Sequence, residues 1–225
     1  MNYATLFKTI QAYVENEFPD TAVINTSAAS TDFTTKEQID SFIKQAEQRI
    51  YNSVQILALR KNVLGTTTAA NKYLSVPSDW LANFSLAVID GDGNYNYLLN
   101  KDVNFIREAF PYPATTGLPT HYAMFDEDSY ILGPTPDAAY NVELHYFYYP
   151  ASIVDAGTSW LGDNFDSVLL YGSLLEAYTF MKGENDVNQN YISRYNEALA
   201  MLKQLSEGKN RQDMYRTQQA RYPVK

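Results

Sequence analysis

The sequence contains no cysteine, only two histidines and only two tryptophans among its 225 residues. The lack of cysteine excludes disulfides, thiol nucleophiles and zinc sites that need a Cys ligand. A Ser-His-Asp arrangement would have to use His121 or His145, and neither lies beside a nucleophile-elbow sequence. No glycine-rich segment has the Walker or Rossmann context. The sequence therefore predicts a protein that is not an enzyme and that holds no cofactor and no metal.

Long apolar runs are missing as well. No window approaches the roughly 18 apolar residues that a membrane span requires. The N-terminal segment MNYATLFKTIQAYVENEF mixes charged and apolar residues, and it lacks the uninterrupted apolar core of a signal peptide. We therefore expect a soluble protein that is made in the cytoplasm and has no membrane partner.

The charge is acidic overall but unevenly distributed. The net charge is -9, yet residues 209–225 carry five basic side chains and one acidic one. The other 208 residues hold twelve basic and twenty-five acidic side chains. Such a body repels nucleic acid at long range. A basic tail is able to bind nucleic acid or an acidic protein surface, and its interleaved Tyr215 and Tyr222 favour a protein partner.

Tyrosine is the residue in excess, with 19 copies. Its ring offers a large contact area and its hydroxyl a polar tip, so tyrosine is enriched at protein interfaces. The composition therefore favours interaction surfaces over a merely tyrosine-rich core.

Four segments have the apolar spacing of helices. Residues 3–18 form the first, and a capping box of Thr34 and Glu37 begins a second that runs to about Leu59. A third helix begins near Phe165 and ends at a cap formed by Gly183, and a fourth carries an apolar seam up to Leu205. We expect an α+β fold in which N- and C-terminal helix pairs form a four-helix bundle.

The intervening residues are predicted to be an antiparallel β-module inserted into that bundle. Expected strands cover residues 71–76, 85–89 and 140–148, a hairpin joins residues 122–125 to 130–132, and residues 101–110 form a short helix. The predicted domains are 1–61 (N-terminal helices), 62–150 (β-module), 151–207 (C-terminal α-hairpin) and 208–225 (extended basic tail).

Three short segments are candidate sites. The segment Asp90–Asn94 begins like a calcium loop, but the sixth and twelfth positions are Tyr95 and Lys101, so a plain hairpin turn is favoured. Adjacent acids at a predicted hairpin tip are splayed into solvent, so they favour a negative surface over a catalytic pair; these are Asp126, Glu127 and Asp128. A run of aromatic residues is equally consistent with a buried strand and with a subunit or tail contact; these are Tyr146, Phe147, Tyr148 and Tyr149.

Several segments, in their order and spacing, resemble the head-to-tail adaptor proteins of tailed bacteriophages. The similarity covers about residues 70–205 and is carried by the sequences VPSDWL, GLPTHY, LGPTPD, LYGSLLEA and YNEAL, which begin at Val76, Gly117, Leu132, Leu170 and Tyr195. The resemblance implies a non-enzymatic virion protein of the neck that forms a dodecameric ring between portal and tail. The implied partners are other copies of the chain, the portal protein, a tail nozzle or tail-tube protein, and double-stranded DNA that passes through the channel without specific binding.

Within this interpretation, the acids at the hairpin tip are candidates for a channel or surface lining, and the basic tail is expected to reach the portal. The portal-interaction candidates are Lys209, Arg211, Tyr215, Arg216, Arg221 and Tyr222. Two alternatives stay open. One is a carbohydrate- or receptor-binding module of a phage tail, with Trp80 or Trp160 as a stacking platform, and the other is a phage hydrolase that uses the acidic cluster.

Overall fold

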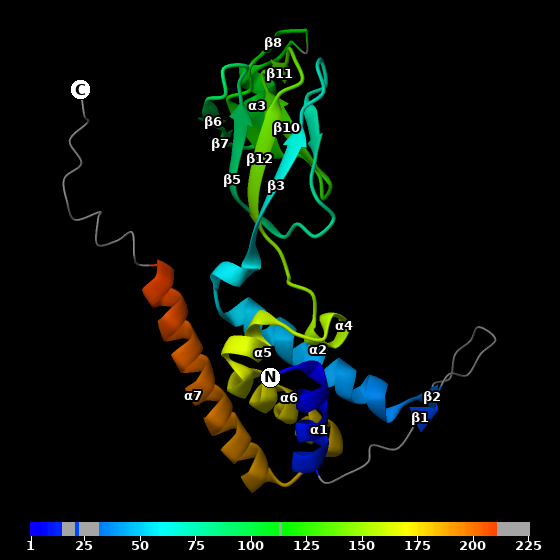
Figure 1. Cartoon of the computed structure of the whole chain (residues 1–225). Helices are drawn as coiled ribbons and strands as arrows, with labels where there is room; N and C mark the ends of the chain where they lie inside the picture. Colours follow the sequence, from blue (N-terminus) through cyan, green and yellow to red (C-terminus); the bar gives the residue numbers. More distant parts are fainter. Residues whose placement is uncertain (15–20, 23–31, 113, 211–225) are drawn as a thin grey trace. The chain divides into compact units, whose positions relative to one another are not determined.

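The computed structural model describes residues 1–14, 21–22, 32–112 and 114–210, and it divides the chain into two compact units (Figure 1). The helical unit consists of Met1–Ala58 and Pro150–Lys225, and the β unit consists of Leu59–Tyr149. Helices and mainly antiparallel sheets occur together, so the predicted α+β class is confirmed.

The helical unit is built around one central helix. Helix α6 packs against α1, α2, α5 and α7. Because neighbours surround it, α6 buries apolar side chains around most of its circumference, as expected for an enclosed helix. The unit contains α1 (Tyr3–Val14), α2 (Thr35–Ser53), α4 (Ile153–Ala156), α5 (Trp160–Asn164), α6 (Asp166–Met181), α7 (Asn185–Asn210) and the short antiparallel pair of β1 (Thr21–Ala22) with β2 (Asp32–Phe33).

Close packing of α6 depends on a glycine. A Cβ atom on Gly172 would lie 3.3 Å from the Cβ of Ala46 in α2 and 3.3 Å from Cε2 of Tyr195 in α7. One helical turn further along, Glu176 forms an ion pair with Arg49 of α2. The absence of a side chain at Gly172 therefore lets α2, α6 and α7 approach one another closely at this point.

The boundaries of α2 confirm one sequence prediction and correct another. Thr34 and Glu37 form the predicted capping box: the Glu37 N–H donates to Thr34 Oγ1 (3.3 Å), and the Thr34 N–H donates to the Glu37 carboxylate (2.9 Å). Helix α2 ends at Ser53 rather than near Leu59, because Val54 already has an extended backbone. A 3-10 turn, η1 (Leu57–Leu59), follows.

The end of α6 differs from the expected glycine cap. Lys182 is the residue in the left-handed conformation (φ 53°), and the Gly183 N–H donates to the carbonyl of Tyr178 (3.0 Å). Glycine is required there by contact, since a Cβ on Gly183 would lie 2.4 Å from the Tyr178 ring. Residues 15–18, predicted to continue the first helix, lie outside the described residues.

The β unit contains two four-stranded sheets and a small pair. The first sheet has the antiparallel order β3-β12-β5-β6, and the second has the order β4-β10-β9-β7, with β7 parallel to β9. The parallel β7–β9 and β8–β11 pairs are exceptions to the antiparallel module that the sequence predicted. The strands are β3 (Arg60–Thr66), β4 (Tyr73–Ser75), β5 (Ala82–Ile89), β6 (Tyr95–Tyr97), β7 (Leu99–Asn100), β8 (Thr116–Gly117), β9 (His121–Met124), β10 (Ser129–Gly133), β11 (Thr135–Pro136) and β12 (Asn141–Phe147).

The inner faces of the two sheets share one core. Alternate residues of β5, β9, β10 and β12 point into it because side chains alternate along a strand. Within this core, Asn83 accepts hydrogen bonds from the Trp80 indole N–H (2.7 Å) and from the hydroxyl of Tyr130. The buried members are Leu86, Val88, Leu98, Tyr122, Tyr130, Leu132, Val142, Leu144 and Tyr146.

Helix α3 (Val103–Ala109) covers the outer face of the second sheet. Its Ile106 packs on Ala123 of β9 and Ile131 of β10, the residues that alternate with the inward-facing ones. A Cβ on Gly133 would lie 2.6 Å from the Phe110 ring, so glycine lets the end of α3 approach β10. The outer face of this sheet is therefore a second small core.

Candidate interaction surfaces

The outer face of the first sheet exposes large apolar side chains. The exposed fractions are 69% for Leu64, 52% for Phe84, 51% for Tyr95 and 69% for Tyr97. Contiguous exposed apolar side chains of this kind typically mark interaction sites. We call this surface the open sheet face and define it by Arg60, Leu64, Phe84, Tyr95, Tyr97, Glu143, His145 and Phe147.

Strand register explains why these residues share one side. Leu64 pairs with Glu143, Glu143 with Ala87, and Ala87 with Tyr97, which gives a row across all four strands. The neighbouring inward positions, including Val142, belong to the core. Ala87 lies in this outward row yet is only 2% exposed, because larger side chains surround it.

A β-bulge places one aromatic ring on the same surface. The register between β12 and β5 shifts between His145 and Tyr146, which leaves Phe84 as an extra residue on β5. Its ring lies 4.9 Å from the His145 ring and 6.2 Å from the Phe147 ring, measured between centroids. The bulge thus assembles an aromatic cluster from two strands.

Arg60 lies on this cluster without an acidic partner. Its guanidinium is 4.4 Å from the Phe84 ring centroid and 5.4 Å from that of Phe147. No ion pair to Arg60 occurs among the residues that the structure describes, and its Nε atom is buried without a hydrogen-bond acceptor. Glu143 on the same face is already engaged, since it accepts a hydrogen bond from Asn62 (2.5 Å) and raises the pKa of Tyr95.

The predicted acidic cluster lies at the tip of the β9–β10 hairpin, and the hairpin itself is confirmed. Asp126 accepts hydrogen bonds from the Asp128 N–H (3.0 Å) and the Ser129 hydroxyl (2.7 Å), and the Ser129 bond is the main cause of its lowered pKa. The Val76 N–H donates to the Asp128 carbonyl (2.9 Å). We call residues 126–128 the acidic tip; all three are exposed, and none forms an ion pair with a described residue.

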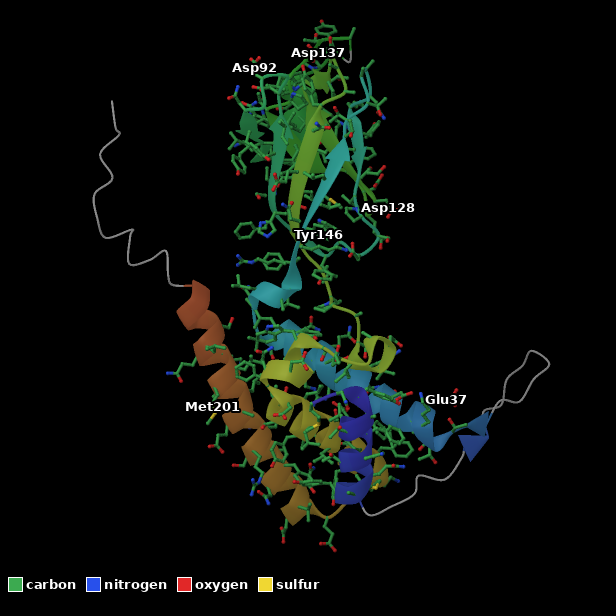
Figure 2. All side chains as sticks on the ribbon, in the orientation of Figure 1. Glu37, Asp92, Asp128, Asp137, Tyr146 and Met201 are labelled. Carbon is green, nitrogen blue, oxygen red and sulfur yellow. The ribbon has the colours of Figure 1, made fainter. Side chains whose placement is uncertain are left out.

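The second acidic turn is the predicted hairpin connection between β5 and β6. Asp90 accepts hydrogen bonds from the backbone N–H groups of Asn94 (2.8 Å) and Asp92 (3.0 Å); the Asn94 bond is the main cause of its lowered pKa. Its carboxylate therefore holds the turn, and the segment is the plain hairpin turn that the sequence favoured. Figure 2 shows Asp92 and Asp137 near one end of the β unit and Asp128 away from them.

The run of aromatic residues at the end of β12 divides between core and surface. Tyr146 is fully buried and donates a hydrogen bond to Asp79 (2.7 Å), so its side chain belongs to the core rather than to an interface. Phe147 lies on the open sheet face, Tyr148 packs partly against the core, and Tyr149 is 40% exposed. An interface role for Phe147, Tyr148 and Tyr149 stays a prediction.

The side chains of both tryptophans, the candidate stacking platforms, contact other aromatic rings of the same chain. Trp80 is bonded to Asn83, and its ring meets that of Tyr130 edge-on. The Trp160 ring in the helical unit lies tilted beside that of Phe165, 5.7 Å between centroids, and lines a small cavity together with Leu205. The remaining histidine, His121, hydrogen-bonds Thr120 and lies beside the Phe105 and Phe110 rings.

A charged groove of 480 Å³ lies between α2 and α4 in the helical unit. Four of its five charged side chains form two ion pairs, Lys36 with Asp40 (2.6 Å) and Lys44 with Asp155 (3.0 Å), and the fifth, Glu37, belongs to the capping box. Across the described part of the chain, no group of three His, Cys, Asp or Glu side chains is placed to hold a metal ion. Over the same residues, no helix is both long and apolar enough to span a bilayer.

The predicted portal-binding residues fall at the edge of the described structure. Helix α7 continues to Asn210, so residues 208–210 are helical rather than extended. Lys209 lies in that last turn. The other five candidates, Arg211, Tyr215, Arg216, Arg221 and Tyr222, lie outside the described residues.

An exposed aromatic sheet face and a separate acidic tip are features of a protein that binds other macromolecules. The sequence model of the family described as SU10 adaptor protein matches residues 1–222, and the chain belongs to this family. A search of the curated proteins gave no match. The family assignment confirms the resemblance to phage head-to-tail adaptors and implies a place in the virion neck among head and tail proteins.

Proposed function

We propose that the protein is a structural subunit of the virion neck that assembles into a ring of about twelve copies between the portal and the tail nozzle. The ring continues the channel through which DNA leaves the head. The match to an adaptor family over residues 1–222 carries this proposal, because it includes both structural units and most of the basic tail.

The charge distribution supports a role beside moving DNA. The net charge is -9; residues 209–225 are net basic, whereas the other 208 residues hold twenty-five acidic and twelve basic side chains. An acidic wall offers DNA no cations that would displace its counterions, so DNA slides without being held. The exposed acids of residues 126–128 are candidates for such a lining or, alternatively, for a negatively charged surface elsewhere on the subunit.

The basic tail is the proposed contact with the portal. Its five cations and two tyrosines suit an acidic protein surface, where each Arg is able to bind a carboxylate through two parallel hydrogen bonds. This assigns Lys209, Arg211, Tyr215, Arg216, Arg221 and Tyr222 to portal binding.

Mass measurement of the purified chain, alone and mixed with its portal protein, tests the ring directly. We expect a complex with about a dozen copies of the chain per portal, visible as a ring by electron microscopy. A chain that stays monomeric in the presence of portal would contradict the proposal.

Deletion of residues 211–225 tests the tail and leaves α7 intact. We expect co-purification with portal to be lost while the fold, followed by circular dichroism, is kept. A triple variant with Arg211, Arg216 and Arg221 changed to Gln removes three cations of the tail. Its matched control changes Lys182, Arg194 and Lys203 of the helical unit to Gln instead. Equal loss of binding in both triple variants would show that bulk charge matters rather than the tail.

A carbohydrate- or receptor-binding role is the second candidate. The exposed rings of Tyr95 and Tyr97 favour it, because flat aromatic surfaces are able to stack on sugar rings. A glycan screen separates the two functions: binding that is lost in Tyr97→Ser would favour the second.

A further inference from the structure

We propose that the open sheet face of one copy receives the acidic tip of a neighbouring copy, so that adjacent β units contact each other head to tail. This inference rests on the proposed ring and names the contact that closes it. It follows from two unsatisfied and complementary groups on the same unit.

The first group is the guanidinium of Arg60. It lies over the Phe84 and Phe147 rings and has no acidic partner among the described residues. Aromatic rings that stack on a guanidinium hold it in one orientation before a partner binds. Its two parallel N–H donors then match the two oxygens of a carboxylate, which makes a carboxylate its most favourable partner. The surrounding exposed Leu64 and Tyr97 supply apolar surface whose burial would favour a protein ligand.

The second group is the acidic tip. Its carboxylates lack a cationic partner in the described structure, and its backbone is fixed by the hydrogen bonds of Asp126 and by the Val76–Asp128 bond. A fixed turn loses little conformational freedom when it binds, so its charge is available at low entropic cost. Asp126 holds the turn, which leaves Glu127 and Asp128 as the groups that reach a partner.

The two groups favour a second copy over a different protein. Both belong to one β unit, yet they form no ion pair with each other. A cyclic assembly uses heterologous contacts, in which one surface of each subunit meets a different surface of the next. A chain that carries both halves of a complementary pair on separate surfaces meets that requirement.

Charge exchange tests the pairing. Arg60→Glu and the double change Glu127→Lys/Asp128→Lys are each expected to weaken ring formation on portal on the order of tenfold. The combined variant restores the attraction with reversed signs, so its assembly should return to within about threefold of the original. Lys101→Glu and Asp92→Lys, which alter exposed charges elsewhere on the β unit, should have little effect.

Folding is checked for each variant by circular dichroism and by tryptophan fluorescence. Arg60→Gln removes the cation without introducing a charge that repels the acidic tip, so it should weaken assembly less than Arg60→Glu does. Tyr97→Ser should weaken assembly, whereas Tyr112→Ser, at a residue that is 74% exposed but not on the open sheet face, should not.

A cross-link tests the same contact without relying on energetics. Since the chain has no cysteine, Leu64→Cys and Glu127→Cys in one chain introduce the only two thiols. Oxidation of rings assembled on portal should give a ladder of covalent multimers, while Leu64→Cys with Tyr112→Cys should give none.

The outcomes separate the contact from the function. Rings that form normally with every variant and give no ladder would overturn the contact but leave the ring in place. Variants of the open sheet face that lose portal binding, without rescue by the tip, would overturn the contact in favour of a portal surface. A wild-type chain that forms no ring on portal would refute the proposed function and the contact together.

Discussion

The two four-stranded sheets of the β unit share one core but differ on their outer faces. Helix α3 covers the second sheet by placing Ile106 on Ala123 and Ile131, whereas the described structure has no element over the exposed Leu64 and Tyr97 of the first sheet. The same alternation of side chains thus produces a closed face and an open one. The difference shows that a strand pattern determines which residues share a side, but a separate element decides whether that side is buried.

Removal of the Ile106 side chain should break the closed face and give the largest loss of stability. Ile106→Ala takes a buried side chain from the contact between α3 and the sheet, so we expect about 3 kcal/mol of destabilisation. Urea unfolding followed by Trp80 fluorescence in a Trp160→Phe background reports on the β unit, because each unit contains one tryptophan. A loss below about 1 kcal/mol would mean that α3 does not stabilise the sheet.

Gly133→Ala tests the same face from the sheet side. The added Cβ would lie 2.6 Å from the Phe110 ring and 3.1 Å from Ile106, so the end of α3 has to shift. We expect about 2 kcal/mol of destabilisation in the same assay. Gly91→Ala, at a turn residue with no atom within 4 Å of its added Cβ, is the control.

The bond between Tyr146 and Asp79 should contribute less. Tyr146→Phe removes one buried hydroxyl that donates to Asp79, and we expect a loss of about 1 kcal/mol. Asp79→Asn should cost at most about 1 kcal/mol, because this carboxylate is partly exposed and screened.

The stabilisation that the Asp79 carboxylate contributes should depend on pH in a defined direction. Lys61, and then Tyr146, lower the pKa of Asp79 below its ordinary value of 3.8. The contribution of the carboxylate is therefore present above that value and is lost as the pH falls through the lowered pKa. The stability difference between the original chain and Asp79→Asn should shrink in acid; a difference that grows below pH 3.8 would contradict the assignment.

Leu64→Ser should have the smallest effect on stability. Its side chain is 69% exposed on the open sheet face, so we expect a change within about 0.5 kcal/mol in the urea assay. The contrast with Ile106→Ala measures how far the two faces differ. A large loss from Leu64→Ser would indicate that this face is covered within a single chain.

The local signals in the sequence were sufficient for much of the fold. The capping box at Thr34, the β9–β10 hairpin and the central strands β5 and β12 were predicted because each depends on neighbouring residues. Strand β3 was missed, since in the sequence RKNVLGT only Val63 reaches the core and the charged residues obscure the alternation. The end of α2 was misplaced because Val54 and Leu57 continue the apolar spacing after the backbone has become extended.

The open sheet face was harder to predict than the acidic tip. Adjacent acids in a turn are visible in the sequence, whereas Phe84, Tyr95 and Leu64 have the same alternation as core residues. Their exposure depends on the absence of a covering element among the described residues, which is a property of the tertiary structure. The bulge that places Phe84 beside Phe147 depends on the register of two distant strands.

The two ends of the β unit meet each other: the N–H of Tyr148 donates to the carbonyl of Leu59 (2.9 Å). For the helical unit, residues 59–149 therefore act as a short connection between Ala58 and Pro150. The entropic cost of closing so long a loop is offset by interactions within the β unit itself. A change in the length or surface of residues 59–149 therefore leaves the spacing of the two chain ends that enter the helical unit unaltered, provided that the Leu59–Tyr148 bond is kept.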